Sequence, residues 1–217
     1  MPPKRNPELH KQNARRFIEA ARIMLASEAF EDISIRRIAA EAGFRNSTLY
    51  SYFRDADWLI ALASVGYFKK YSETLAEISQ KGNTPYETFF LIWKSFCENA
   101  FANPDLFYNF FFGKYSESLT ELFEEYYDLY PDEENEFSPN IREMFFGQNL
   151  NDRCLSILKE LIDAPDTRIR RDNFSIVNFI VIKTLEGFLQ NELHNQHPFG
   201  SDPTEAFLKM LHYLIDQ

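Results

Sequence analysis

One short segment of the chain concentrates side chains that donate hydrogen bonds to phosphates and to the edges of DNA bases. These residues are Arg45, Asn46, Ser47, Thr48, Tyr50 and Tyr52. Guanidinium, amide and hydroxyl groups are the donors that proteins use on phosphate oxygens and base edges. We expect the first four at the N-terminal end of a helix, which is the end that reaches bases in the major groove. We expect the hydroxyl of Tyr50 to contact a phosphate. For Tyr52, a phosphate contact and packing on the first helix are equally supported.

The residues around this segment predict two short helices joined by a tight turn. Ser34 is a suitable N-cap, because its hydroxyl can accept a hydrogen bond from a free amide of the first turn. Gly43 can adopt the left-handed conformation that ends a helix. Apolar residues recur at helical spacing on both sides of the turn, at Ile35, Ile38 and Ala39 and then at Leu49 and Phe53. Residues 34–53 therefore predict a helix-turn-helix, with a purely structural helical hairpin as the alternative.

Two neighbouring arginines lie in the first turn of the first of these helices. Arg36 and Arg37 point about 100° apart, so they cannot share one role. We expect one to contact a phosphate and the other a carboxylate of the protein. Ser34 and Arg54 complete the set of predicted DNA-binding residues.

These motifs resemble the DNA-binding signature of the TetR (tetracycline-repressor) family of bacterial transcription regulators. The matching residues are Ile38-Ala39, Ala42-Gly43, Thr48-Leu49-Tyr50, Tyr52-Phe53 and Leu59. The resemblance covers residues 11–71, and it implies an all-α fold with an N-terminal three-helix DNA-binding domain. It also implies a C-terminal helical domain, residues 72–217, for ligand binding and dimerisation. About nine to ten helices are expected in all, and one of them is predicted to run unbroken over residues 56–80 as a rod from the first domain into the second.

Three positions depart from the family pattern. Phe44 stands where a smaller Val is usual, and Ser47 where Gly is common. Ala56 stands where the resemblance implies a Lys that holds a phosphate. Loss of that cation should lower the salt slope of DNA binding by about one. Arg54 is two residues away and is the candidate replacement.

The charge of the chain is divided unevenly. The net charge is −10, but residues 1–60 hold ten Lys/Arg against eight Asp/Glu, and residues 61–217 hold 13 against 25. A mildly basic head on an acidic body can bind DNA if the basic groups face the phosphates. Lys4 and Arg5 are either additional phosphate or minor-groove contacts or part of a solvated tail.

Several other classes of protein are disfavoured by the sequence. It has no apolar run long enough for a transmembrane helix and no apolar region behind the basic N-terminus, so a cytoplasmic protein without a membrane partner is expected. Cys97 and Cys154 are expected as buried thiols. His194 and His197 are three residues apart, but no third metal ligand is evident. Without a combination of acid, base and nucleophile, we expect neither an enzyme nor a cofactor.

The second domain is rich in aromatic rings. Such a concentration predicts a pocket for a hydrophobic small-molecule effector, although core packing accounts for most rings. The predicted lining residues are Phe89, Phe90, Trp93, Phe96, Phe107, Tyr108 and Phe111.

Two helices predicted at residues 172–194 and 204–216 carry apolar residues on more than one face. The resemblance implies that they form a four-helix bundle with the same pair of a second subunit. A monomer that buries both helices internally is the alternative. The predicted interface residues are Phe174, Val177, Ile180, Val181, Phe188, Phe207, Leu211 and Leu214.

Together these features predict a homodimeric, ligand-responsive DNA-binding regulator. The resemblance implies a repressor that binds a palindromic double-stranded operator and is released by a hydrophobic or aromatic small molecule. The alternative is a helical carrier or scavenger of hydrophobic small molecules with a vestigial DNA-binding head. Net acidity and the missing Lys at position 56 support that alternative.

Overall fold

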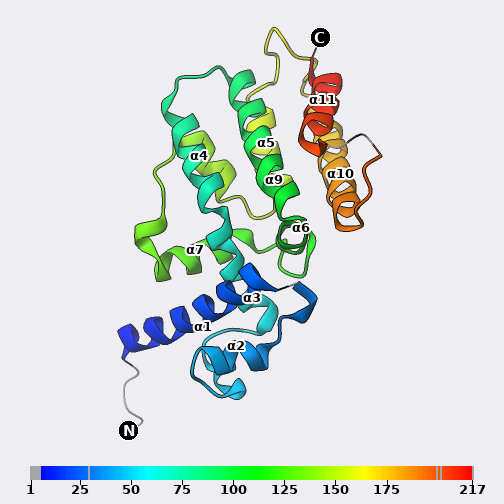
Figure 1. Cartoon of the computed structure of the whole chain (residues 1–217). Coiled ribbons are helices and arrows are strands. Elements are labelled where there is room, and N and C mark those ends of the chain that lie inside the picture. Colours follow the sequence, from blue (N-terminus) through cyan, green and yellow to red (C-terminus); the bar gives the residue numbers. More distant parts are fainter. Residues whose placement is uncertain (1–5, 29, 199, 201, 217) are drawn as a thin grey trace. The chain divides into compact units, whose positions relative to one another are not determined.

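The computed structural model describes residues 6–28, 30–198, 200 and 202–216. Within these ranges the elements are eleven α-helices and four short 3₁₀ helices, with one isolated bridge between Thr167 and Asp216 (Figure 1). The all-α prediction is therefore confirmed, with slightly more helices than expected. Lys4 and Arg5 lie outside the described residues. No described helix is long and apolar enough to cross a membrane.

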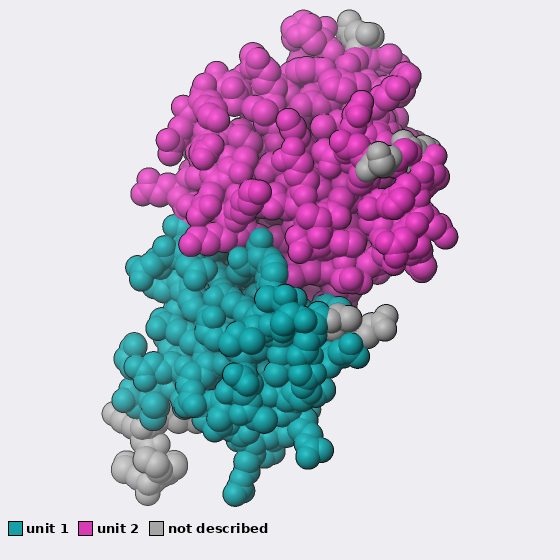
Figure 2. All heavy atoms as spheres, viewed as in Figure 1, with its two compact units in different colours: residues 1–67, 122–134 teal, residues 68–121, 135–217 magenta. Residues whose placement is uncertain are grey.

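The chain divides into two compact units (Figure 2). Unit 1 holds residues 1–67 and 122–134, and unit 2 holds residues 68–121 and 135–217. The chain therefore passes from one unit to the other three times. No sequence pattern indicated that the short segment 122–134 packs with the N-terminal helices.

Unit 1 is built on three helices that pack around a small apolar core. Its elements are α1 (Pro7–Ser27), η1 (Phe30–Asp32), α2 (Ile35–Glu41), η2 (Asn46–Ser51), α3 (Ala56–Val65), most of α7 (Leu119–Leu129) and η4 (Pro131–Glu133). Helix α1 packs against α2 and α3. Phe17, Leu49 and Leu59 are fully buried among them. The helical spacing of these apolar residues explains why this core forms.

The local signals at the turn are confirmed. The Ser34 hydroxyl caps α2 by accepting from the Arg37 amide at 3.3 Å. Gly43 has φ +78°, the left-handed conformation that other residues adopt at a cost. Asp55 caps α3 by accepting from the Trp58 amide at 2.9 Å.

The predicted unbroken helix over residues 56–80 is wrong. Helix α3 ends at Val65, the 3₁₀ helix η3 spans Gly66–Phe68, and α4 spans Lys69–Gln80. Gly66 explains the break, because glycine weakens a helix interior. A Cβ at this position would also lie 2.6 Å from the guanidinium of Arg22, so a larger residue does not fit.

Unit 2 is a helical body with a ring-rich core. Its elements are η3 in part, α4, α5 (Pro85–Ala102), α6 (Pro104–Phe112), α8 (Pro139–Phe145), α9 (Leu150–Lys159), α10 (Phe174–Leu193) and α11 (Pro203–Ile215). Helix α5 packs against α4 and α11, and α10 packs against α6 and α9. Thr84 and Glu87 form a capping box at the start of α5, and Pro85 occupies its first turn.

Candidate nucleic-acid interface

The segment Asn46–Ser51, called the recognition segment because the sequence predicts DNA contacts there, is a six-residue 3₁₀ helix rather than an α-helix. Its amides bond three residues back, as Thr48 N to Arg45 O and Tyr52 N to Leu49 O, each at 2.9 Å. Leu49 is fully buried and fixes the segment to the core. Asn46, Ser47 and Tyr50 are exposed, with Thr48 half-buried. The polar side chains thus face outward from the segment, as an interface to DNA requires.

The structure separates the two arginines of α2. Both guanidinium amino groups of Arg37 donate to the Glu28 carboxylate at 2.5 Å, and this hydrogen bond with the Glu28 charge raises the pKa of Arg37. Arg36 is exposed and makes no hydrogen bond or ion pair with any described residue. The same is true of Arg45, which caps η2 through its backbone alone. Among the described residues of α2 and the recognition segment, Arg36 and Arg45 are therefore cations without a carboxylate partner.

Tyr52 is held inside unit 1. Its hydroxyl accepts a hydrogen bond from Asn13 Nδ2 at 2.9 Å, and its ring lies 5.7 Å from that of Phe17. The hydroxyl proton remains available for a phosphate. The ring contacts nevertheless favour the packing interpretation.

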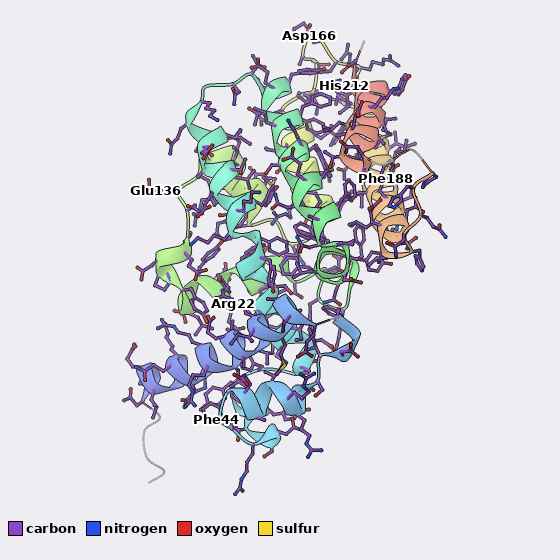
Figure 3. The ribbon with its side chains drawn as sticks, in the orientation of Figure 1. Arg22, Phe44, Glu136, Asp166, Phe188 and His212 are labelled. Carbon is purple, nitrogen blue, oxygen red and sulfur yellow. The ribbon has the colours of Figure 1, made fainter. Side chains whose placement is uncertain are left out.

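Arg16 adds a cation that the sequence did not single out. Its guanidinium lies 4.7 Å from the ring centre of Phe44, which itself stacks on Phe17 at 4.9 Å (Figure 3). A Cβ at Gly43 would approach Arg16 to 2.7 Å. The large Phe44 ring therefore holds a cation at the turn of the helix-turn-helix.

Other basic residues of α1 are bound within unit 1 and do not serve this surface. Lys11 pairs with Asp128 at 2.6 Å, and Arg15 Nε donates to the Leu129 carbonyl at 2.7 Å. Arg22 pairs with Glu19 at 2.7 Å and Glu133 at 3.6 Å. The segment 122–134 supplies most of these partners.

Arg54, the proposed replacement for the missing lysine, lies over the Trp58 ring at 4.1 Å. Its charge also lowers the pKa of Glu125, although burial raises that pKa overall. Arg54 is exposed, so its side chain is accessible from solvent.

A match to a known family now decides the identity. A family model described as bacterial regulatory proteins of the tetR family matches residues 17–61, the part of unit 1 that holds the turn and the recognition segment. Residues 17–61 are therefore a DNA-binding segment of the TetR type, and the chain is a DNA-binding transcriptional regulator. No curated protein sequence matches the chain.

Solved structures share the fold of this TetR family protein. RolR in complex with resorcinol has a TM-score of 0.62 at 17% identity, over 96% of this chain and 90% of that chain. Thermus thermophilus FadR, a TetR family transcriptional repressor in complex with lauroyl-CoA, has a TM-score of 0.58 at 16% identity, over 92% and 91%. A TetR transcriptional regulator from Rhodococcus sp. RHA1 has a TM-score of 0.54 at 13% identity, over 94% of each chain.

The aromatic residues predicted to line a pocket are dispersed. Trp93 and Phe96 border a small cavity, whereas Phe89, Phe107 and Phe111 are buried in the ring-rich core. Two others are engaged at the surface of unit 2. Phe90 stacks on His212 at 4.1 Å (Figure 3), and the Tyr108 hydroxyl accepts from Gln190 Nε2 at 3.1 Å.

The cavity also brings together residues that sequence reasoning missed. It is bordered by Tyr71 of α4 and Arg153 of α9, besides apolar side chains of α5, α8 and α9. Arg153 is 3% exposed, although it occupies an amphipathic helix where an arginine is normally solvated. The only sequence signal is its place between buried neighbours of α9.

The predicted interface residues of α10 and α11 divide into two groups. Five are buried within the subunit, namely Val177, Val181, Phe188, Phe207 and Leu211. Phe174 and Leu214 are half-buried, and Ile180 is exposed. The apolar side chains that α10 and α11 leave most exposed include Ile176, Phe179 and Tyr213, which the sequence analysis did not select.

The prediction of buried thiols agrees with the structure. Cys97 and Cys154 are free and buried, and burial raises the pKa of both thiols. His194 bonds to the Gln190 carbonyl and His197 to Glu192. Among the described residues, no group of three or more His, Cys, Asp or Glu side chains could hold a metal ion.

Proposed function

We propose that this regulator is a repressor that binds a palindromic operator as a homodimer and releases it when a hydrophobic small molecule binds unit 2. In terms of sequence, residues 11–71 would bind DNA and residues 72–217 would bind the ligand and the second subunit. The observation that carries the DNA contact is the outward-facing row of polar side chains from the recognition segment and α2. It consists of Arg36, Arg45, Asn46, Ser47, Thr48 and Tyr50.

The two arginines of α2 give a matched test of this contact. Arg36→Gln should weaken binding to DNA from around the protein's own gene and reduce the salt slope by about one, because one phosphate contact is lost. Arg37→Gln should change operator affinity less, because Arg37 is already paired with Glu28. Fluorescence anisotropy at two salt concentrations measures both effects. Equal losses for the two variants would contradict the assignment, and no specific binding by the wild type at low salt would contradict the regulator function.

An unpartnered apolar face on α10 and α11 supports the homodimer. Ile176, Phe179 and Ile180 are 61%, 60% and 38% exposed on one side of α10, and Tyr213 on α11 is 72% exposed. A groove of about 520 Å³ lies between the two helices on this side. Large apolar side chains exposed together are typical of an interface.

Gly187 on α10 gives a second argument for the homodimer. It lies in the helix interior, where glycine costs about 1 kcal/mol relative to alanine. A Cβ there would meet no atom within 4 Å, so nothing inside the subunit requires the glycine. Close approach of a helix from a second subunit would explain it, and a two-fold axis would bring the same helix from the partner.

The dimer is tested by placing a charge on this face. Phe179→Glu should give a monomer at micromolar concentration in light scattering and should abolish tight operator binding, because the two half-sites can then no longer be bound together. Leu91→Glu is the matched control, since Leu91 is 38% exposed on α5 and away from this face. A dimeric Phe179→Glu protein would contradict the interface.

Release of DNA requires that the ligand prefer a different conformation of the protein. The cavity bordered by Tyr71, Trp93 and Arg153 has a volume of about 20 Å³, so a small-molecule ligand must enlarge it on binding. The chain offers a physical link, because segment 122–134 joins unit 2 at both ends and binds Lys11, Arg15 and Arg22 of α1. RolR and FadR were solved with resorcinol and lauroyl-CoA, and both ligands contain apolar parts. The alternative function, a carrier of hydrophobic small molecules, would instead favour a cavity that is already large enough for its ligand.

A further inference from the structure

A buried polar cluster interrupts the apolar core of unit 2. The cavity at its centre has a volume of about 20 Å³, room for roughly one water molecule. It is bordered by Tyr71, Ile92, Trp93, Phe96, Met144, Leu150, Arg153, Cys154 and Ile157. Among these described lining residues there is one cation and no carboxylate. The hydrogen-bond donors of this cluster indicate which chemical groups the cavity can bind.

Two of the lining residues offer hydrogen-bond donors without a good acceptor. Trp93 is 3% exposed, and its buried Nε1 has no hydrogen-bond partner among the described residues. The Tyr71 hydroxyl donates only to the Met144 sulfur, at 4.0 Å, and a thioether is a weak acceptor. Burial raises the pKa of Tyr71 to about 12 against the opposing influence of Arg153, so the phenol keeps its proton.

Arg153 supplies a fixed cation beside these donors. Its Nη1 donates to the Phe145 carbonyl, and its guanidinium hydrogen-bonds Tyr71 and lies 5.6 Å from the ring centre of Phe111. A guanidinium has five N–H donors in a planar fork, which matches the oxygens of a carboxylate or a phosphate. The three side chains thus offer donors from three different helices, α4, α5 and α9.

We propose that the effector is an apolar carboxylic acid whose carboxylate binds Arg153, Tyr71 and the Trp93 indole N–H. Its apolar part would lie among Ile92, Leu150 and Ile157 at the opposite wall. This inference rests on the proposed function, because it names the chemical class of the ligand that releases DNA. Since small-molecule pockets usually exceed about 300 Å³, the acid must part α8 and α9 from α4 and α5 as it enters.

Matched acid and amide pairs test the head group with the full-length protein. We would titrate octanoate against octanamide and 3-phenylpropanoate against 3-phenylpropanamide by calorimetry. At least one acid should bind about ten-fold or more tightly than its amide, the usual effect of a charged hydrogen bond. Equal affinities within both pairs, or no binding by either acid to a protein that still binds operator, would overturn the proposal.

Changes to the proposed donors in the protein locate the carboxylate. Tyr71→Phe should weaken binding of the acid about five-fold or more while leaving the amide within about two-fold. Trp93→Phe should act in the same direction, and it serves as a second variant if one of them folds poorly. Tyr67→Phe is the matched control, because the Tyr67 hydroxyl bonds the Arg22 carbonyl at 3.3 Å, outside the cavity. Unchanged acid affinity in Tyr71→Phe and Trp93→Phe would overturn the site.

A gel shift in the presence of the same acids separates this inference from the proposed function. Release of operator by the acid and not by the amide supports both. Tight, Tyr71-dependent binding of the acid without release would keep the site and contradict the ligand-controlled repressor. Release by the neutral amide at the same concentration as by the acid would keep the repressor and contradict the carboxylate.

Discussion

Half-buried Arg22 of unit 1 and buried Arg153 of unit 2 have contrasting surroundings. Arg22 of unit 1 pairs with Glu19 and Glu133 and bonds the Tyr126 hydroxyl (Figure 3). Burial opposes its charge, but Tyr126 and the surrounding acids outweigh that effect, so the pKa of Arg22 is raised. Arg153 of unit 2 contacts a carbonyl, a phenol and aromatic rings beside a cavity without an acidic lining residue.

The difference shows how to distinguish a structural cation from a ligand-binding one. Arg22 pairs with two carboxylates and joins α1 to segment 122–134, although its buried Nε has no hydrogen-bond partner among the described residues. Arg153 sits beside space and donors that lack acceptors, an arrangement that a carboxylate would complete. Burial alone does not distinguish the two, because both side chains are largely removed from water.

The comparison predicts that Arg22 contributes strongly to the stability of unit 1. Arg22→Met should lower the free energy of unfolding by about 3 kcal/mol, because it leaves the Glu133 carboxylate and the Tyr126 hydroxyl without their cation. Urea unfolding measures the loss. Lys94→Met is a suitable control, since its pair with Glu98 is exposed and 4.0 Å long, and it should change stability by less than about 0.5 kcal/mol. A loss as small for Arg22→Met as for the control would break the comparison.

The next largest expected effect is on the stabilisation by a bound ligand, which should differ between the surroundings of Arg22 and those of Arg153. A carboxylic acid at 100 times its dissociation constant should stabilise the wild type by about 2.7 kcal/mol. Arg22→Met should show the same gain from its own lower baseline, and Tyr71→Phe should show a smaller one at the same concentration. Thermal unfolding with and without the acid measures these gains. If Arg22→Met lost the stabilisation too, the two cations would not have separate roles.

The space around Arg22 gives a third prediction. Gly66→Ala should cost about 2 kcal/mol, because the new methyl group would meet the guanidinium at 2.6 Å. In an Arg22→Met background the flexible side chain can move aside, so most of this cost should disappear. A double-mutant cycle in urea measures the coupling. If the stability losses of the two substitutions were additive, the cost of Gly66→Ala would not come from its contact with Arg22.

The smallest expected effect is the contribution of Glu125 to the pH dependence of stability. Its carboxylate accepts a hydrogen bond from Trp58 Nε1 at 2.9 Å. Burial raises the pKa of Glu125, opposed by that bond and by Arg54. A carboxyl with a raised pKa stabilises the fold while protonated, and that contribution is lost as the pH rises through the raised value. Glu125→Gln keeps the acceptor but not the charge, so it should flatten the dependence of the melting temperature on pH above the ordinary pKa of a glutamate carboxyl. An unchanged slope would contradict the raised pKa.

The sequence predicted those features of unit 1 that depend on a few neighbouring residues. The Ser34 cap and the left-handed Gly43 each involve one side chain or one backbone conformation within a single turn. The recognition segment was located correctly, although its 3₁₀ geometry was not foreseen because periodicity hardly separates 3₁₀ from α over six residues.

Contacts between distant residues were beyond the sequence. The space beside Gly66 is limited by Arg22, 44 positions earlier, and the partners of Lys11 and Arg15 lie in segment 122–134. The aromatic rings predicted to line a pocket were chosen by abundance, and most of them fill the core instead. On α10 the helical spacing identified apolar residues, but only packing shows that Val177 and Val181 face inward while Ile176 and Phe179 face outward.

By itself, the sequence determined that this is an all-helical regulator with a helix-turn-helix at residues 34–53. Caps, turns and apolar spacing are local features, because each depends on residues that are close together in the sequence. Only the tertiary structure decided which arginines remain free for DNA, which one is neutralised by its own protein, and which one lies beside a cavity. That is because the state of a charged side chain depends on groups that approach it from other helices, and their distance along the chain gives no indication of their distance in space.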